Sequence, residues 1–231
     1  MHPPLLVAAN RAALYGTVAR WLMHDLRGPA QALSLVSDLL ESGDDMDEPA
    51  VRLSLQEASA RLRELLELLD RVLRRSEPDE TPRPVVVRDS LVLLCRLLGL
   101  QRSTVTLDME PALAAPLPAV RSAEEYLQHA LLAILVNAYE AQACRPAGAV
   151  RVTAEVSGST VRLGVEDDGP GVPPEVAGRL FEPFVTTRAG YPLAGLGLYS
   201  ARVLLERTGG TVRHEPRAQG TRFVLELPVW S

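Results

Sequence analysis

Residues 51–72 place an apolar side chain at alternating steps of four and three positions, without a miss. The positions that keep this spacing are Val51, Leu55, Ala58, Leu62, Leu65, Leu69 and Val72, and charged residues occupy most of the remaining surface. A heptad pattern of this kind is typical of a helix in a bundle. The chain is therefore expected to contain a helical bundle in its first third.

Residues 10–41 carry a second helical pattern, whose apolar residues form two adjoining stripes. The stripes are Leu22, Leu26, Pro29, Leu33, Val36 and Leu40, and Leu14, Val18, Trp21, Ala32, Leu35 and Leu39. Gly43 and the acidic run 44–48 should end this helix, and Pro49 suits the first turn of the next one. Because two helices cannot bury faces this wide against each other alone, the sequence predicts a four-helix bundle made by two chains, and hence a homodimer.

The pattern changes after a short proline-rich segment with alternating charge. We predict a helical hairpin over 1–76, a linker over 77–84 and an α/β domain over 85–231. Strands are expected at 85–87, 104–109, 150–156, 160–166, 211–214 and 222–227, and helices at 88–100, 123–143 and 198–208. The fold class is then α+β, with the hairpin preceding an α/β sandwich.

Composition and charge exclude several classes of protein. A net charge of -5 argues against a wholesale basic face for nucleic acid. No apolar run approaches the roughly 20 residues that span a bilayer. The two cysteines, Cys95 and Cys144, show no metal-ligand spacing and are too few for a secreted disulfide framework, so we expect a cytoplasmic protein.

His24 lies on the margin of the apolar face of the first helix, within the segment Met23-His24-Asp25-Leu26-Arg27-Gly28-Pro29. A neutral imidazole there can act as a nucleophile, and the adjacent Asp25 can orient the ring or accept its proton. Pro29 permits a local kink one turn later. By itself, a histidine beside an aspartate on a helix is usually incidental.

Three further features suit a nucleotide, although each alone is a weak signal. Asp167, Gly169 and Gly171 combine a carboxylate at the end of a strand with a tight backbone turn. Gly195 and Gly197 open the last long helix, where bare amides and the helix dipole favour phosphate. Asn137, in the middle of the helix at 123–143, could offer an oxygen to Mg²⁺. The alternatives are an ordinary turn, an ordinary helix start and a buried core amide.

Taken together, these segments resemble the histidine kinase family of two-component signalling, over nearly the whole chain. The segment 24–29 is similar to the phosphoacceptor box, 131–141 to the asparagine box, 167–171 to the first glycine box, 181–184 with 186–188 to the phenylalanine box and ATP lid, and 195–198 to the second glycine box. Residues 220–228 resemble the closing strands of the family.

The resemblance implies an ATP-dependent protein-histidine kinase whose second domain is the α/β sandwich shared with gyrase and MutL ATPases. Asp167 would hold the adenine amine beside Thr221, and Asn137 would ligate Mg²⁺. Gly195, Gly197, Thr187 and Arg188 would face the phosphates of ATP. The γ-phosphoryl group would pass to His24 and then to an aspartate of a response regulator.

Three positions depart from the family pattern. Gly28 stands where many members carry Asn or Thr, which puts phosphatase activity in doubt. Ala133 replaces a frequent polar residue one turn before Asn137, and Leu193 replaces a frequent glycine before Gly195. These changes weaken the expectation of full catalysis and leave the glycines of the nucleotide boxes intact.

Two other functions stay open at this point, and the heptads of residues 51–72 count against a third, an ATP-hydrolysing or serine-phosphorylating relative that would not need the helical hairpin. A histidine phosphotransferase would relay phosphate from a regulator instead of from ATP, and its nucleotide boxes would be expected to decay. A nucleotide-binding pseudokinase scaffold would not need His24. Labelling by ATP alone separates both from a kinase.

Overall fold

The structure, a computed structural model, describes residues 3–42, 48–73, 81–99, 105–109, 112, 114–142, 148–187 and 194–231. Its contacts divide the chain into two compact units. One unit comprises residues 15–77, and the other comprises residues 1–14 together with 78–231. The domain boundaries expected from the sequence, 1–76, 77–84 and 85–231, stay a prediction, and each unit is described by itself below.

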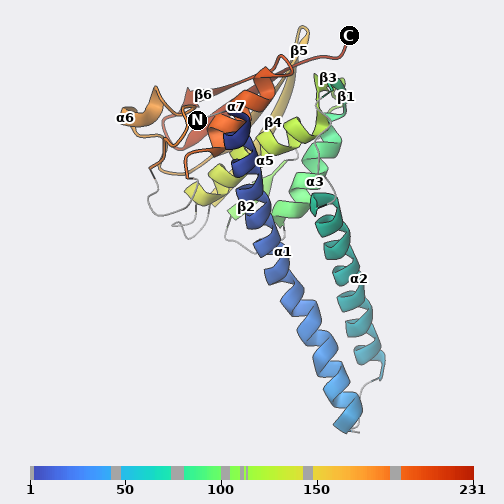
Figure 1. The fold of residues 1–231 in the computed structure, drawn as a ribbon. Helices are drawn as coiled ribbons and strands as arrows, with labels where there is room; N and C mark the ends of the chain where they lie inside the picture. The colour runs from blue at the N-terminus through green and yellow to red at the C-terminus, as the bar shows by residue number, and fades with distance from the viewer. Residues whose placement is uncertain are drawn as a thin grey trace. The chain divides into compact units, whose positions relative to one another are not determined.

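The unit 15–77 consists of two long helices, most of α1 (Pro3–Ser42) and all of α2 (Glu48–Leu73) (Figure 1). Proline at the start of α1 costs little because the first N–H groups of a helix have no partner within it. The helix continues through Pro29. Val18, Leu22, Val36, Ala58 and Leu65 are buried, and all five belong to the predicted apolar stripes. These five positions therefore mark the inner faces of the two helices, whereas Leu35 of the same stripes is 60% exposed.

The second unit contains a five-stranded sheet in the order β2-β4-β5-β7-β6. The strands are β2 (Val105–Asp108), β4 (Gly148–Ser157), β5 (Thr160–Asp167), β6 (Thr211–Pro216) and β7 (Thr221–Pro228). β2 runs parallel to β4, and the other neighbours are antiparallel. Its helices are α3 (Val87–Gly99), α5 (Glu124–Ala141), the short α6 (Pro174–Ala177) and α7 (Gly197–Glu206).

Two short strands, β1 (Arg83–Val85) and β3 (Val120–Ser122), form a separate antiparallel pair in this unit. β1 begins two residues earlier than the expected strand at 85–87, because Arg83 and Pro84 pair with Ser122 and Arg121. β3 was not expected from the sequence. The pairing of strands this short is fixed by a distant partner and not by local pattern.

Alternation along the strands gives the sheet two different faces. Val161, Leu163 and Val165 of β5 lie opposite Leu227, Leu225 and Phe223 of β7, and all six are buried on the side that α5 and α7 cover (Figure 1). Burial of each such side chain contributes about 2 kcal/mol. The opposite face carries ion pairs such as Arg162–Glu226 and Arg222–Glu166. This arrangement confirms the predicted fold class, with N-terminal helices followed by an α/β sandwich.

Candidate nucleotide-binding site

Asp167 ends β5 on the covered face of the sheet, directly opposite Thr221 of β7. The residue is 2% exposed, and its carboxylate receives hydrogen bonds from the backbone N–H of Gly169, at 2.8 Å, and from Thr221. Burial raises the pKa of Asp167, and these hydrogen bonds oppose the rise. The result is a desolvated carboxylate with a fixed orientation, which suits recognition of an amine.

The residue before β7 packs so closely against the backbone at Asp167 that it must be glycine. Gly220 has φ +76°, and a Cβ there would overlap the backbone oxygen of Asp167. Gly169 is also confined, since its Cβ would lie 2.7 Å from the Asp167 Oδ1 atom and 3.0 Å from the Ala141 Cβ. Gly171 also has a positive φ, +79°, and lies against the Gly220 carbonyl. The predicted Asp167, Gly169, Gly171 and Thr221 are thus brought together at one end of the sheet.

Just before α7, the backbone at Gly195 packs closely against the backbone at Phe184, which is the second close contact of this kind. Gly195 has φ +81°, and a Cβ there would lie 2.6 Å from the carbonyl carbon of Phe184. Phe184 N donates a hydrogen bond to the Gly195 oxygen at 3.0 Å. The adjacent Gly197 would bring a Cβ to 4.0 Å from the Ala133 Cβ on α5. A small residue at Ala133 therefore lets the two helices pack closely.

One face of α5 links these two glycine segments. Ala133, Asn137 and Ala141 follow one another at steps of four residues and so lie in a row along the helix. Ala133 is next to Gly197, and Ala141 is next to Gly169. Asn137, which is half-buried, consequently lies between the two glycine segments.

Mg²⁺ keeps few protein ligands when it bridges phosphates, because water and phosphate oxygens complete its shell. Within the described ranges, no group of three or more His, Cys, Asp or Glu side chains could hold a metal ion. A single protein oxygen, such as that of Asn137, is enough for a cation that arrives bound to the phosphates of a nucleotide.

Other predicted site residues are described only in part. Thr187 is exposed at the end of a described segment, and Arg188 and Leu193 lie outside the described residues. His24 belongs to α1, but its side chain lies outside the description. Asp25 forms an ion pair with Arg61 of α2 at 3.0 Å, and its side chain is only 10% exposed. Arg61 thus keeps the carboxylate beside His24 in place and joins the two helices.

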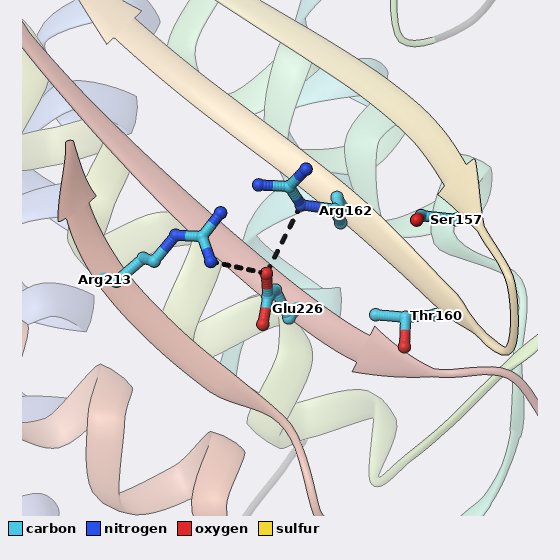
Figure 2. Close-up of a pocket in the computed structure, with 5 residues that line it drawn as sticks. All are labelled: Ser157, Thr160, Arg162, Arg213 and Glu226. Carbon is cyan, nitrogen blue, oxygen red and sulfur yellow. Dashed lines mark hydrogen bonds and ion pairs between the residues drawn. The ribbon is translucent and has the colours of Figure 1, made fainter.

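A hollow of about 300 Å³ on the opposite face of the sheet is a poor alternative site for a nucleotide. Figure 2 shows its lining residues, Ser157, Thr160, Arg162, Arg213 and Glu226. Both guanidinium groups pair with the Glu226 carboxylate, at 3.3 Å and 2.7 Å. Arg162 also pairs with Glu155 at 2.8 Å and Arg213 with Glu215 at 2.8 Å, so the hollow offers no excess positive charge for phosphate.

Two residues at the Asp167 turn were not expected from the sequence. Arg217, in the turn between β6 and β7, donates a hydrogen bond to the Asp167 carbonyl at 3.3 Å and pairs with Glu166. Gln142, just beyond α5, is fully buried next to Asp168 and Gly169. Neither lies in a motif, and only a contact between distant segments reveals them.

Comparison with known proteins agrees with this geometry. Residues 122–231 match the family described as histidine kinase-, DNA gyrase B- and HSP90-like ATPase. The C4-dicarboxylate transport sensor protein DctB of Rhizobium meliloti (strain 1021) is 29% identical over 229 residues, which cover 96% of this chain and 36% of that protein. The signal transduction histidine-protein kinase AtoS of Escherichia coli (strain K12) is 27% identical over 229 residues, 97% of this chain and 36% of that protein.

Among solved structures, the catalytic domain of histidine kinase ThkA superposes with a TM-score of 0.55 at 24% identity, over 64% of this chain and 95% of that one. At this identity the likeness shows the fold. The chain spans about a third of the length of the two curated relatives. In the part that the structure describes, no helix is long and apolar enough to cross a membrane.

Residues 122–231 therefore match the family that comprises the ATPase domains of histidine kinases, DNA gyrase B and HSP90. Within this class, the relatives identify the chain as similar to sensor histidine kinases, with a histidine kinase ATP-binding core.

Proposed function

We propose that the chain is the catalytic core of a cytoplasmic sensor histidine kinase, which phosphorylates its own His24 from Mg-ATP and passes the phosphoryl group to an aspartate of a response regulator. The observation that carries the proposal is the buried Asp167 turn, closed by Gly220 and Thr221 and linked along one face of α5 to the glycines that open α7. An α/β unit of this kind accompanies a helical pair that contains His24.

ATP would be held by groups from several elements. Asp167, beside Thr221, accepts a hydrogen bond from the exocyclic amine of adenine. Gly195, Gly197 and the N-terminus of α7 face the phosphates, because free N–H groups and the helix dipole favour anions there. Thr187 and Arg188 complete the phosphate side. Mg²⁺, ligated by Asn137, would neutralise phosphate charge.

Phosphoryl transfer would use the imidazole of His24 as the nucleophile. One ring nitrogen forms the new bond to the γ-phosphorus while the bond to the β-γ bridging oxygen breaks and ADP leaves. Asp25 receives or orients the proton on the other ring nitrogen. The ion pair with Arg61 at 3.0 Å keeps that carboxylate in place.

We further propose that two chains pair through their helices. Leu35 belongs to a predicted apolar stripe, yet it is 60% exposed in the single chain, and Met23 is exposed to the same extent. Exposed apolar side chains on an amphipathic helix favour a second copy, which converts two helices into a four-helix bundle.

The decisive experiment incubates the protein with γ-labelled ATP and Mg²⁺ and measures acid-labile, alkali-stable label. We expect label in the unmodified chain and none in His24→Gln. Asn137→Ala should lose label through weaker Mg-ATP binding. His214→Gln, the same change at another histidine, and Gln128→Ala, which removes another amide side chain of α5, should retain the label.

Label that persists in His24→Gln would reject the assigned acceptor. An unmodified chain that binds ATP but takes no label would reject the kinase. Transfer of label to His24 from a phosphorylated receiver domain would then support a phosphotransferase, and its absence would support a nucleotide-binding scaffold.

A further inference from the structure

Gln142 follows the last residue of α5, five positions after Asn137, and is fully buried. The amide orientation that satisfies its surroundings turns the side-chain oxygen toward the turn after β5. In this orientation Oε1 accepts hydrogen bonds from Asp168 N at 2.8 Å and from Gly169 N at 3.0 Å. Gln142 thus ties the end of α5 directly to the turn that follows Asp167.

The surroundings of Gln142 leave its side chain little freedom. A Cβ at Gly148, the first residue of β4, would overlap the Gln142 amide and lie 2.8 Å from its Cδ atom. Ala141, the residue before Gln142, packs against Gly169. The amide therefore lies between the end of α5, the start of β4 and the turn after β5.

Gly169 N–H lies within hydrogen-bonding distance of two acceptors, the Asp167 Oδ1 atom at 2.8 Å and the Gln142 oxygen at 3.0 Å. A change in the Gln142 contact therefore acts directly on a donor of the Asp167 carboxylate. Buried N–H groups that lose an acceptor move to find another, and such movement would reorient the turn.

We propose that Gln142 is a positioning residue for adenine recognition, which holds the Asp168 and Gly169 amides so that the Asp167 carboxylate faces the nucleotide base. The inference rests on the proposed function, since it assumes that Asp167 binds the adenine amine. Asn137, within α5, then serves the phosphate side of the site, and Gln142, just after α5, positions the turn that binds the base.

The test compares the dissociation constants of ATP and inosine triphosphate by calorimetry. Inosine triphosphate carries an oxygen where adenine has its exocyclic amine, so it lacks the hydrogen bond to Asp167. In Gln142→Met, which keeps the length of the side chain without its acceptor, ATP binding should weaken about tenfold. Binding of inosine triphosphate should change less than about twofold, because the phosphate side of the site is untouched.

Two more variants of Gln142 and one control variant make the result decisive. Gln142→Glu keeps an acceptor of the same length and should recover most of the preference for ATP at pH 8. Gln142→Asn keeps the amide but is one methylene shorter, so it should lose the preference, and it answers the question if Gln142→Met fails to fold. Gln128→Met, the matched change at the half-buried Gln128 of α5, should leave both affinities unchanged.

Equal weakening of both nucleotides in Gln142→Met and Gln142→Asn would overturn the positioning role and assign Gln142 to general folding. Unchanged affinity would overturn it as well. An unmodified chain that binds neither nucleotide, or binds both equally, would instead overturn the proposed use of Asp167, so the two failures are distinguishable.

Discussion

The carboxylate of Asp167 is buried at the end of a strand although a charged group there is poorly solvated. Hydrogen bonds from Gly169 and Thr221 compensate in part, but burial still raises its pKa. A group whose pKa is raised by folding stabilises the fold below its unfolded pKa, and this contribution is lost as the pH rises through the folded pKa. Burial of the ionised Asp167 carboxylate therefore does not stabilise the fold, and nucleotide binding is the reason we propose for its position.

Asp167→Asn should separate these two properties. Asn keeps an oxygen for the Gly169 N–H but carries no charge, so the melting temperature at pH 7 should stay equal or rise. ATP affinity should fall at least about tenfold, because the amide can present an N–H group to the adenine amine and its oxygen is a weaker acceptor. Thermal unfolding and calorimetric titration check the two effects. Asp168→Asn, the same change next in sequence, should leave ATP affinity nearly unchanged.

Gly220 offers a test of backbone packing around the same turn. Gly220 and Gly158 both have positive φ, +76° and +59°, but only at Gly220 does an added Cβ meet backbone atoms. Gly158→Ala should thus cost only about 1 kcal/mol for the left-handed conformation. Gly220→Ala should cost about 3 kcal/mol or more, because Asp167 must also move. Urea unfolding of the two variants measures the difference, and equal costs would show that the turn yields easily.

Local sequence was sufficient to predict Asp167, Gly169, Gly171 and the glycines of α7, because tight turns and helix starts have local signatures. It could not predict Gln142, whose two hydrogen bonds reach a turn far along the chain. The functional roles of the site residues, His24 above all, stay predictions until the labelling experiment is done.

Among the secondary-structure elements, amphipathic helices and the central strands were predicted to within a few residues, since their periodicity extends over several turns or pairs. The short β1 and β3 were displaced or missed, because their pairing depends on each other. The beginning of α1 at Pro3 was also unexpected. Its first residues belong to the same compact unit as residues 78–231, hereafter the ATP-binding unit, through tertiary contacts that no local pattern predicts.

That contact includes a buried histidine on α5. Asn10 Nδ2 lies 3.0 Å from His129 Nε2, and Val7 packs in one apolar cluster with Ala123, Tyr126 and Leu204. Burial, together with the nearby Arg11, lowers the pKa of His129 to about 4. The ring is neutral at pH 7, and its Nε2 atom can accept a hydrogen bond from the Asn10 amide.

The ATP-binding unit should therefore be sensitive to acid through His129. A histidine whose pKa is lowered by folding contributes stability above its unfolded pKa near 6.5, and this stability is lost as the pH falls toward about 4. The loss amounts to about 3 kcal/mol between these values. In His129→Gln, which can still accept from Asn10 but does not titrate, the loss over this interval should shrink by that amount. Urea unfolding at pH 7 and pH 4 measures it, and an unchanged pH dependence would refute a buried neutral ring.

In the whole molecule, the two units present different surfaces to their surroundings. One face of the sheet in the ATP-binding unit carries many ion pairs, among them Arg213–Glu226 and Arg151–Asp108. These charged side chains are well solvated by water. The helices α1 and α2 instead expose large apolar side chains, including Leu35, Leu53 and Leu66. An ion-paired sheet face needs no cover, whereas the helices favour association with a second copy.

Leu35→Glu should accordingly dissociate the proposed dimer. Burying a leucine contributes about 2 kcal/mol, and a two-fold interface counts each substitution twice, so the dimer should weaken by about 4 kcal/mol, or about a thousandfold in its dissociation constant. Sedimentation equilibrium measures that constant. Val156→Glu, which changes an equally apolar and half-exposed side chain on β4, should leave it unchanged. If both variants and the unmodified chain sediment as monomers at micromolar concentration, the exposed leucines are not a dimer interface; if Leu35→Glu alone dissociates, the apolar stripe of α1 holds the two chains together.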